Sequence, residues 1–272
     1  MARNVLIELQ SIQHFARPTM KLISSALAAV ALASTVNANA ATVKISFDDP
    51  IFGGFAAGSG ATSDTVKIHF PKENRPGQTN SSTAAGRFSG AATELNGVEA
   101  SIFFSSVDDV YMYCYDLYES ISSGQVVTYN INFTGATANT LDFLGAVNYV
   151  MYGNSNTWDD PYAWVRPLTG LQGAAIQLGI WESRYEDSGK WKLEGGSFSA
   201  NQVDKETKDW VDQFFAAMPL ADSLAQRYTM TLEAKGAQDM ITADPPAEVP
   251  EPSPLALLGL AALALGLTRR RG

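Results

Sequence analysis

The chain has 272 residues, of which 46% are hydrophobic and 17% charged, and its formal net charge is −9 at pH 7. Such a chain is long enough to bury a core without disulfides or metals. The acidic balance argues against nucleic acids and anionic membranes as partners, because both carry negative charge. Cys114 is the only cysteine, which excludes a disulfide within the chain.

Residues 1–40 contain the order of residue types that is typical of a secretory signal, if translation begins at Met20. Lys21 precedes an apolar stretch, and Ala38-Asn39-Ala40 supplies a small-x-small cleavage site. We therefore expect an upstream extension and a signal peptide over residues 1–40, Sec-type export, and cleavage between Ala40 and Ala41.

The first half of the region that follows, residues 41–243, has the pattern of a β protein. Residues 42–47 and 65–70 alternate between apolar and polar side chains, as in a strand with one buried face. Loops rich in glycine and proline lie between and after them. Further strands are expected at 86–95, 98–105, 110–116 and 126–133.

The second half changes to helical spacing. Short helices are expected at 141–150 and 173–182, an amphipathic helix at 202–218, and a closing strand at 227–233. Strands, helices and a final strand predict a single exported α+β domain over residues 41–243. Its expected architecture is an antiparallel β barrel or sandwich with an inserted helical subdomain.

Residues 244–272 combine a linker, a short apolar segment and a basic tail. Pro250-Glu251-Pro252 precedes a run from Leu255 to Leu267 that contains only leucine, alanine and glycine, and Arg269-Arg270-Arg271 follows. The run is shorter than the roughly 20 residues of a stable membrane-spanning helix, and the arginines favour the cytoplasmic side. This order resembles the PEP-CTERM sorting signal, a resemblance that implies removal by an exosortase.

These two ends predict the location of the protein. We expect transient anchoring in the inner membrane through the apolar run, and then release to the outer surface of the cell envelope or to the extracellular matrix.

Carboxylates are abundant, and a facing pair of them could support a glycosidase-like reaction. The candidates are Asp108, Asp109, Asp116, Asp159, Asp160, Glu182, Glu186 and Asp187. No pair is distinguished by its sequence context, so we expect no turnover catalysis. His69 is the only histidine of the predicted domain, and no calcium loop with the pattern Asp-x-Asp-x-Asp-Gly is present. The sequence therefore predicts neither a metal nor a cofactor.

Cys114 lies on an expected strand, and Gln177 lies on an expected helix four residues before Trp181, with which it shares a helix face. Tyr113-Cys114, the Gln-x-x-Ile-Trp pattern and the order of elements over residues 98–235 resemble the thioester domains of bacterial surface adhesins. The resemblance implies an internal thioester between Cys114 and Gln177, and covalent attachment to surface amines. Ile176 stands where that family often has threonine.

Formation of a thioester requires these two residue types. A thiolate that attacks the carboxamide carbon of Gln177 expels ammonia and leaves an acyl group that water or an amine can open. Such a group survives only where water is excluded. We expect Tyr113, Tyr115 and Trp181 to provide this shielding.

Other interpretations remain open. Cys114 can be an inert buried residue, and Gln177 can serve only to satisfy a backbone group. A different class of function is non-covalent binding of a matrix exopolysaccharide by exposed aromatic residues such as Trp158, Tyr162 and Trp164. A third is an envelope hydrolase.

Overall fold

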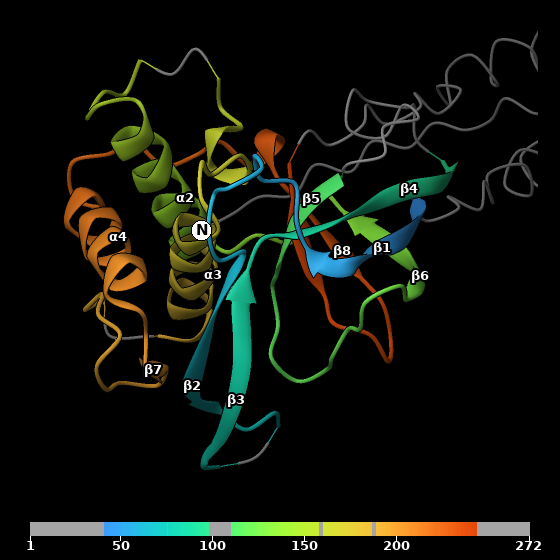
Figure 1. Cartoon of the computed structure of the whole chain (residues 1–272), viewed down its shortest axis with the longest axis horizontal. Helices are drawn as coiled ribbons and strands as arrows, with labels where there is room; N and C mark the ends of the chain where they lie inside the picture. Colours follow the sequence, from blue (N-terminus) through green and yellow to red (C-terminus); the bar gives the residue numbers. More distant parts are fainter. Residues whose placement is uncertain (1–40, 75, 98–109, 158–159, 187–188, 244–272) are drawn as a thin grey trace, which may run out of the picture. The chain divides into compact units, whose positions relative to one another are not determined.

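The computed structural model describes residues 41–243, apart from residues 75, 98–109, 158–159 and 187–188 (Figure 1). These residues fall within one unit of the chain, residues 39–250. The strand predicted at 98–105, the signal peptide with Ala40, and the sorting residues from Pro250 to Arg271 lie outside the described residues.

Six strands of the described residues are antiparallel and close into a barrel in the order β1-β4-β5-β9-β8-β6. They are β1 (Thr42–Phe52), β4 (Phe88–Asn96), β5 (Val110–Cys114), β6 (Val126–Asn132), β8 (Met230–Glu233) and β9 (Met240–Thr242). The alternation in β1 buries Val43, Ile45 and Phe47. The Phe47 ring meets Phe88 and Tyr129 edge to face, so aromatic side chains from three strands pack together.

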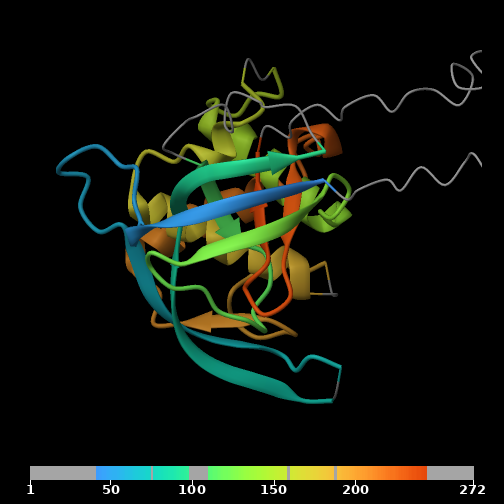
Figure 2. The same ribbon diagram turned by 90° about the vertical axis from the view of Figure 1, so that its right-hand side faces the viewer.

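A second sheet, three-stranded in the part of the chain that is described, has the order β3-β2-β7. Its strands are β2 (Ser63–Pro71), β3 (Gln78–Gly86) and β7 (Ser199–Asn201). Only Arg87 separates β3 from β4, so one long stretch of chain leads from this sheet into the barrel. Figure 2 shows the ribbon of β2 and β3 curving beneath the barrel.

The α-helices of the described residues are α2 (Ala138–Met151), α3 (Gly170–Tyr185) and α4 (Lys205–Ala217); short 3-10 helices are η1 (Ala163–Val165) and η2 (Gln226–Tyr228). Side chains cap each α-helix: Thr137, Thr169 and Asp204 accept backbone N–H groups of the first turn. Helix α4 is amphipathic, whereas α3 is buried along most of its length.

Helix α3 is the central helix (Figure 1): it contacts α2 and α4 as well as β2 and β3. Gly179 permits the close contact with α2, because a Cβ there would overlap the ring of Phe143. Buried residues of the barrel, the second sheet and the helices form one continuous core. The predicted α+β class and antiparallel barrel are confirmed; a separate inserted helical subdomain stays a prediction.

Three strands were not predicted, and several predicted boundaries differ from those of the structure. β3 consists mostly of small polar residues without alternation, and β7 and β9 have three residues each. The last predicted strand begins at Met230, because residues 226–228 form the turn η2. Helix α3 begins at Gly170, ahead of the predicted start, because Thr169 caps it.

Candidate functional site

Cys114 is the last residue of β5 and is 2% exposed. On one side β5 pairs with β9 as far as Cys114, which lies opposite Met240. On the other side the pairing with β4 ends at Met112, opposite Phe88. The backbone N–H and C=O of Cys114 therefore lie beyond the end of the β4 pairing, and buried backbone groups need partners.

The carboxamide of Gln177 on α3 supplies those partners. The Cys114 N–H donates to Gln177 Oε1 over 2.8 Å, and Gln177 Nε2 donates to the Cys114 carbonyl oxygen over 2.8 Å. The Gln177 side chain is completely buried. The structure thus brings the two predicted residues together across 63 positions of sequence, where a side-chain amide takes the place of a neighbouring strand.

The paired hydrogen bonds fix the orientation of the carboxamide. Because its oxygen and its nitrogen both bond the backbone of Cys114, the carboxamide carbon faces the Cα atom that carries the thiol side chain. The Cys114 N–H points at the oxygen on which negative charge would develop if sulfur attacked that carbon. The nitrogen that would leave is held by the Cys114 carbonyl.

Burial, together with a neighbouring carboxylate, favours the protonated form of the Cys114 thiol. Burial raises the pKa of Cys114 well above its ordinary value, the Asp116 carboxylate raises it further, and the Cys114 backbone N–H offsets part of the rise. A buried, protonated thiol is unreactive toward reagents in solution. Any reaction of Cys114 therefore depends on a partner held beside it.

The three residues predicted to shield this pair are all buried. The Tyr113 hydroxyl donates to the carbonyl of Trp164, whose ring centroid lies 6.0 Å from that of Tyr113. The Tyr115 oxygen accepts the backbone N–H of Thr137 at the start of α2. Trp181 packs against Phe198, with ring centroids 6.3 Å apart. Their role as a shield of a thioester stays a prediction.

The three aromatic residues proposed as a sugar-binding surface differ in their exposure. Trp164 is completely buried, which corrects the expectation that it is exposed. Tyr162 is half-buried and packs edge to face on Tyr228. Trp158 lies outside the described residues.

The carboxylates considered for a hydrolase are mostly buried or undescribed. Glu182 is completely buried, and Glu186 is nearly so. Burial raises the pKa of Glu182 to about 8, although its Oε1 accepts the Lys192 backbone N–H. Four others, Asp108, Asp109, Asp159 and Asp187, lie outside the described residues.

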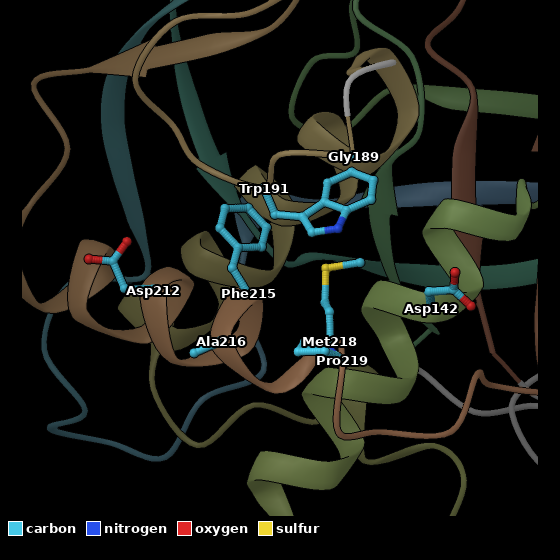
Figure 3. A pocket seen from close by; sticks show the side chains of 8 residues that line it. All are labelled: Asp142, Gly189, Trp191, Asp212, Phe215, Ala216, Met218 and Pro219. Atoms are coloured by element: carbon cyan, nitrogen blue, oxygen red, sulfur yellow. The ribbon is translucent and has the colours of Figure 1, made fainter.

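A cavity of about 550 Å³ opens elsewhere, along α4 (Figure 3). Its lining residues are Asp142, Gly189, Trp191, Asp212, Phe215, Ala216, Met218 and Pro219. In Figure 3 the side chains of Trp191, Phe215 and Met218 lie close together, between Asp212 on the left and Asp142 on the right. Sequence reasoning did not single out Trp191, because the loop that carries it has no regular pattern.

A helix that is both long and apolar enough to span a membrane is absent from the described residues. The predicted anchor, Leu255 to Leu267, lies outside them.

Comparison with known proteins identifies the C-terminal segment. Residues 248–271 match the PEP-CTERM protein-sorting motif, a range that includes Pro250, Glu251 and Pro252 as well as the three arginines from Arg269 to Arg271. The protein is therefore an exported protein sorted by an exosortase, with a cell-surface or extracellular location. No curated protein and no solved structure matches the chain.

Proposed function

We propose that this exosortase-sorted protein attaches covalently to an amine-bearing partner through a thioester between Cys114 and Gln177. The observation that supports the proposal is the pair of hydrogen bonds that holds the Gln177 carboxamide against the Cys114 backbone. The attachment is a single event per molecule, so we propose no turnover catalysis.

Formation of the thioester balances without a further reactant. The Cys114 sulfur attacks the carboxamide carbon of Gln177, the S–C bond forms, and the C–Nε2 bond breaks. The thiol proton passes to the leaving nitrogen, which departs as ammonia. The Cys114 N–H stabilises the developing oxyanion, and the fixed proximity of the two groups compensates for the raised thiol pKa.

Transfer to the partner is the second step. A neutral primary amine attacks the acyl carbon, an amide bond forms, and the sulfur leaves and takes the amine proton. Because both residues are buried, the acyl group is protected from water until a partner reaches it. Surface lysines are the proposed amine donors.

The same hydrogen bonds would also form if Gln177 only satisfied the Cys114 backbone, so the test must detect the covalent bond. The exported protein, with its termini established by peptide mapping, should have an intact mass about 17 Da below the sequence mass, since ammonia is lost. Cys114→Ala and Gln177→Ala should remove this deficit. Gln172→Ala is the matched control, because Gln172 is another buried glutamine of α3, and it should keep the deficit.

Methylamine provides a second measurement. It should react once with the wild-type protein, and the adduct should map to residue 177. A protein of full sequence mass, whose single thiol titrates completely in denaturant, would refute the thioester.

The cavity along α4 favours a second candidate, non-covalent binding of an exopolysaccharide. Trp191 and Phe215 offer aromatic faces, and the carboxylates of Asp142 and Asp212 offer acceptors for hydroxyl groups. Under this alternative, Trp191→Ala abolishes polysaccharide binding in a protein that shows no mass deficit. Tyr162→Ala, a change outside the cavity, should leave binding intact.

A further inference from the structure

A second cavity, of about 340 Å³, lies beside the end of β5. Five of its lining residues carry carboxylates, and Asn130 adds an amide. Single carboxylate oxygens of Asp116, Glu119 and Asp239 all lie within 4.8 Å of one another. In the described part of the chain, none of these three residues forms an ion pair with lysine or arginine.

Backbone N–H groups of the loop between β8 and β9 hold two of these side chains, Glu119 and Asp239. Glu119 Oε1 accepts the Gly236 N–H over 2.7 Å, and Asp239 Oδ1 accepts the Ala234 N–H over 3.1 Å. The Asp239 carbonyl accepts the Tyr115 N–H over 2.7 Å, which places Asp239 next to the segment that carries Asp116. Carboxylates from two separate segments are therefore gathered at one position: Asp116 and Glu119 from the loop after β5, and Asp239 from the loop before β9.

An independent observation indicates a missing ligand. Asp116 is only 9% exposed and lines this cavity, yet its Oδ1 has no hydrogen-bond partner in the described residues. Leaving a buried carboxylate oxygen without a partner is unfavourable, and such atoms are rare in folded proteins. Lys235 also lines the cavity, but no ion pair joins it to these carboxylates among the described residues.

We propose that Asp116, Glu119 and Asp239 bind a calcium ion. The donors are all oxygen atoms, which suit a hard cation. Calcium binds oxygen at about 2.4 Å, so two ligands of one ion lie at most about 4.8 Å apart, and the three oxygens lie within that limit. Magnesium requires shorter bonds and a more regular geometry. The proposal does not depend on the thioester.

Calorimetric titration of the exported protein with calcium chloride tests the proposal. We expect one site with a dissociation constant of roughly 10⁻⁴–10⁻³ M, as in extracellular modules, and a rise in Tm of about 4 °C at 5 mM calcium. Magnesium at the same concentration should raise Tm by less than half as much. Glu119→Gln and Asp239→Asn should each weaken calcium binding at least tenfold. The control Glu94→Gln, in an exposed pair with Lys44, should not.

Terbium luminescence of the wild-type protein is a measurement that needs no folded variant of the site. Tyr118 lines the cavity, so a terbium ion bound there should emit when tyrosine is excited, and calcium should displace it. Tyr118→Phe should reduce the emission without weakening calcium binding. The proposal would be overturned if the titration with calcium released or absorbed no heat and calcium displaced no terbium emission. Unchanged calcium binding in Glu119→Gln and Asp239→Asn would also overturn it.

Discussion

Gln177 occupies a helix whose other buried residues are mostly apolar, and both polar ends of its carboxamide bond a single residue, Cys114. Truncation at this position leaves the Cys114 N–H and C=O without partners in a buried site. Truncation at Cys114 leaves both hydrogen bonds intact, because they involve the backbone. The two substitutions therefore have different costs even in a protein without a thioester.

Glu182 is a residue whose burial predicts a pH effect. Its pKa is raised to about 8 by burial and by Glu186 and Glu194, while Lys192 lowers it. In the unfolded chain the Glu182 carboxyl releases its proton near pH 4.5, whereas the folded protein keeps it up to about pH 8. The contribution of Glu182 to the free energy of unfolding is therefore fully present below pH 4.5 and is lost as the pH rises through 8. Glu182→Gln should flatten this decline and be more stable than wild type at pH 9 by about 1–3 kcal/mol.

Urea unfolding at pH 5, 7 and 9 measures the effect. The exposed Glu94→Gln should follow the wild-type curve at all three values. A Glu182→Gln protein whose stability falls with pH as steeply as wild type would contradict the assignment of the raised pKa.

The pair Cys114 and Gln177 was identifiable from its sequence neighbours, but the reason for their contact was not. It depends on β4 leaving β5 after Met112, and sequence patterns do not tell which strands pair or where pairing ends. The acidic cluster was missed for the same reason. Asp116 and Asp239 meet only because β5 pairs with β9, a strand of three residues with no detectable pattern.

Among the elements, strands with one buried face were predictable and strands without one were not. β1 and β2 alternate between buried and more exposed residues, and the sequence indicated both. β3 exposes Asn80, Ser81 and Ser82 in succession, so no period appears. It is a strand because β2 pairs with it along its whole length.

Two glycines of α3 make a matched test of helix packing. A Cβ at Gly179 would overlap the Phe143 ring, which is itself packed against Phe214 and Phe215. A Cβ at Gly173 would make ordinary contacts, the nearest at 3.4 Å from Pro167. Gly179→Ala should therefore destabilise the protein by about 1–3 kcal/mol, and Gly173→Ala should be neutral or stabilise it by up to about 1 kcal/mol.

Chemical denaturation of both variants measures this difference. Equal effects of the two substitutions would show that α2 can shift away from α3 at little cost.

The proposed thioester would join β5 to α3 and close a loop of 63 residues. By the chain-entropy argument used for disulfides, such a link stabilises the fold by about 4 kcal/mol. Cys114→Ala should then cost about 4 kcal/mol beyond the roughly 1 kcal/mol expected from lost packing. Wild-type protein opened with methylamine should lose about the same 4 kcal/mol. A cost near 1 kcal/mol for Cys114→Ala, together with no effect of methylamine on wild type, argues for an uncrosslinked protein.

At the scale of the whole molecule, the sorting motif at residues 248–271 determines where the protein goes. Replacement of Pro250 and Pro252 by alanine should impair exosortase processing, so that unprocessed chain accumulates in the membrane fraction. Peptide mapping of the C-terminus measures the processed fraction. The control Pro167→Ala changes a proline outside the motif and should be processed normally.

The pairing of Cys114 with Met240 also has a consequence for the order of events during export. In an export that proceeds from the amino end, β5 has no β9 beside it until residue 240 has crossed, shortly before the sorting motif at residue 248 arrives. In such an export the barrel would stay open until then, and Cys114 would not be enclosed. The proposed thioester would then form only when the motif is about to reach the exosortase, so that its formation and sorting would follow closely in time.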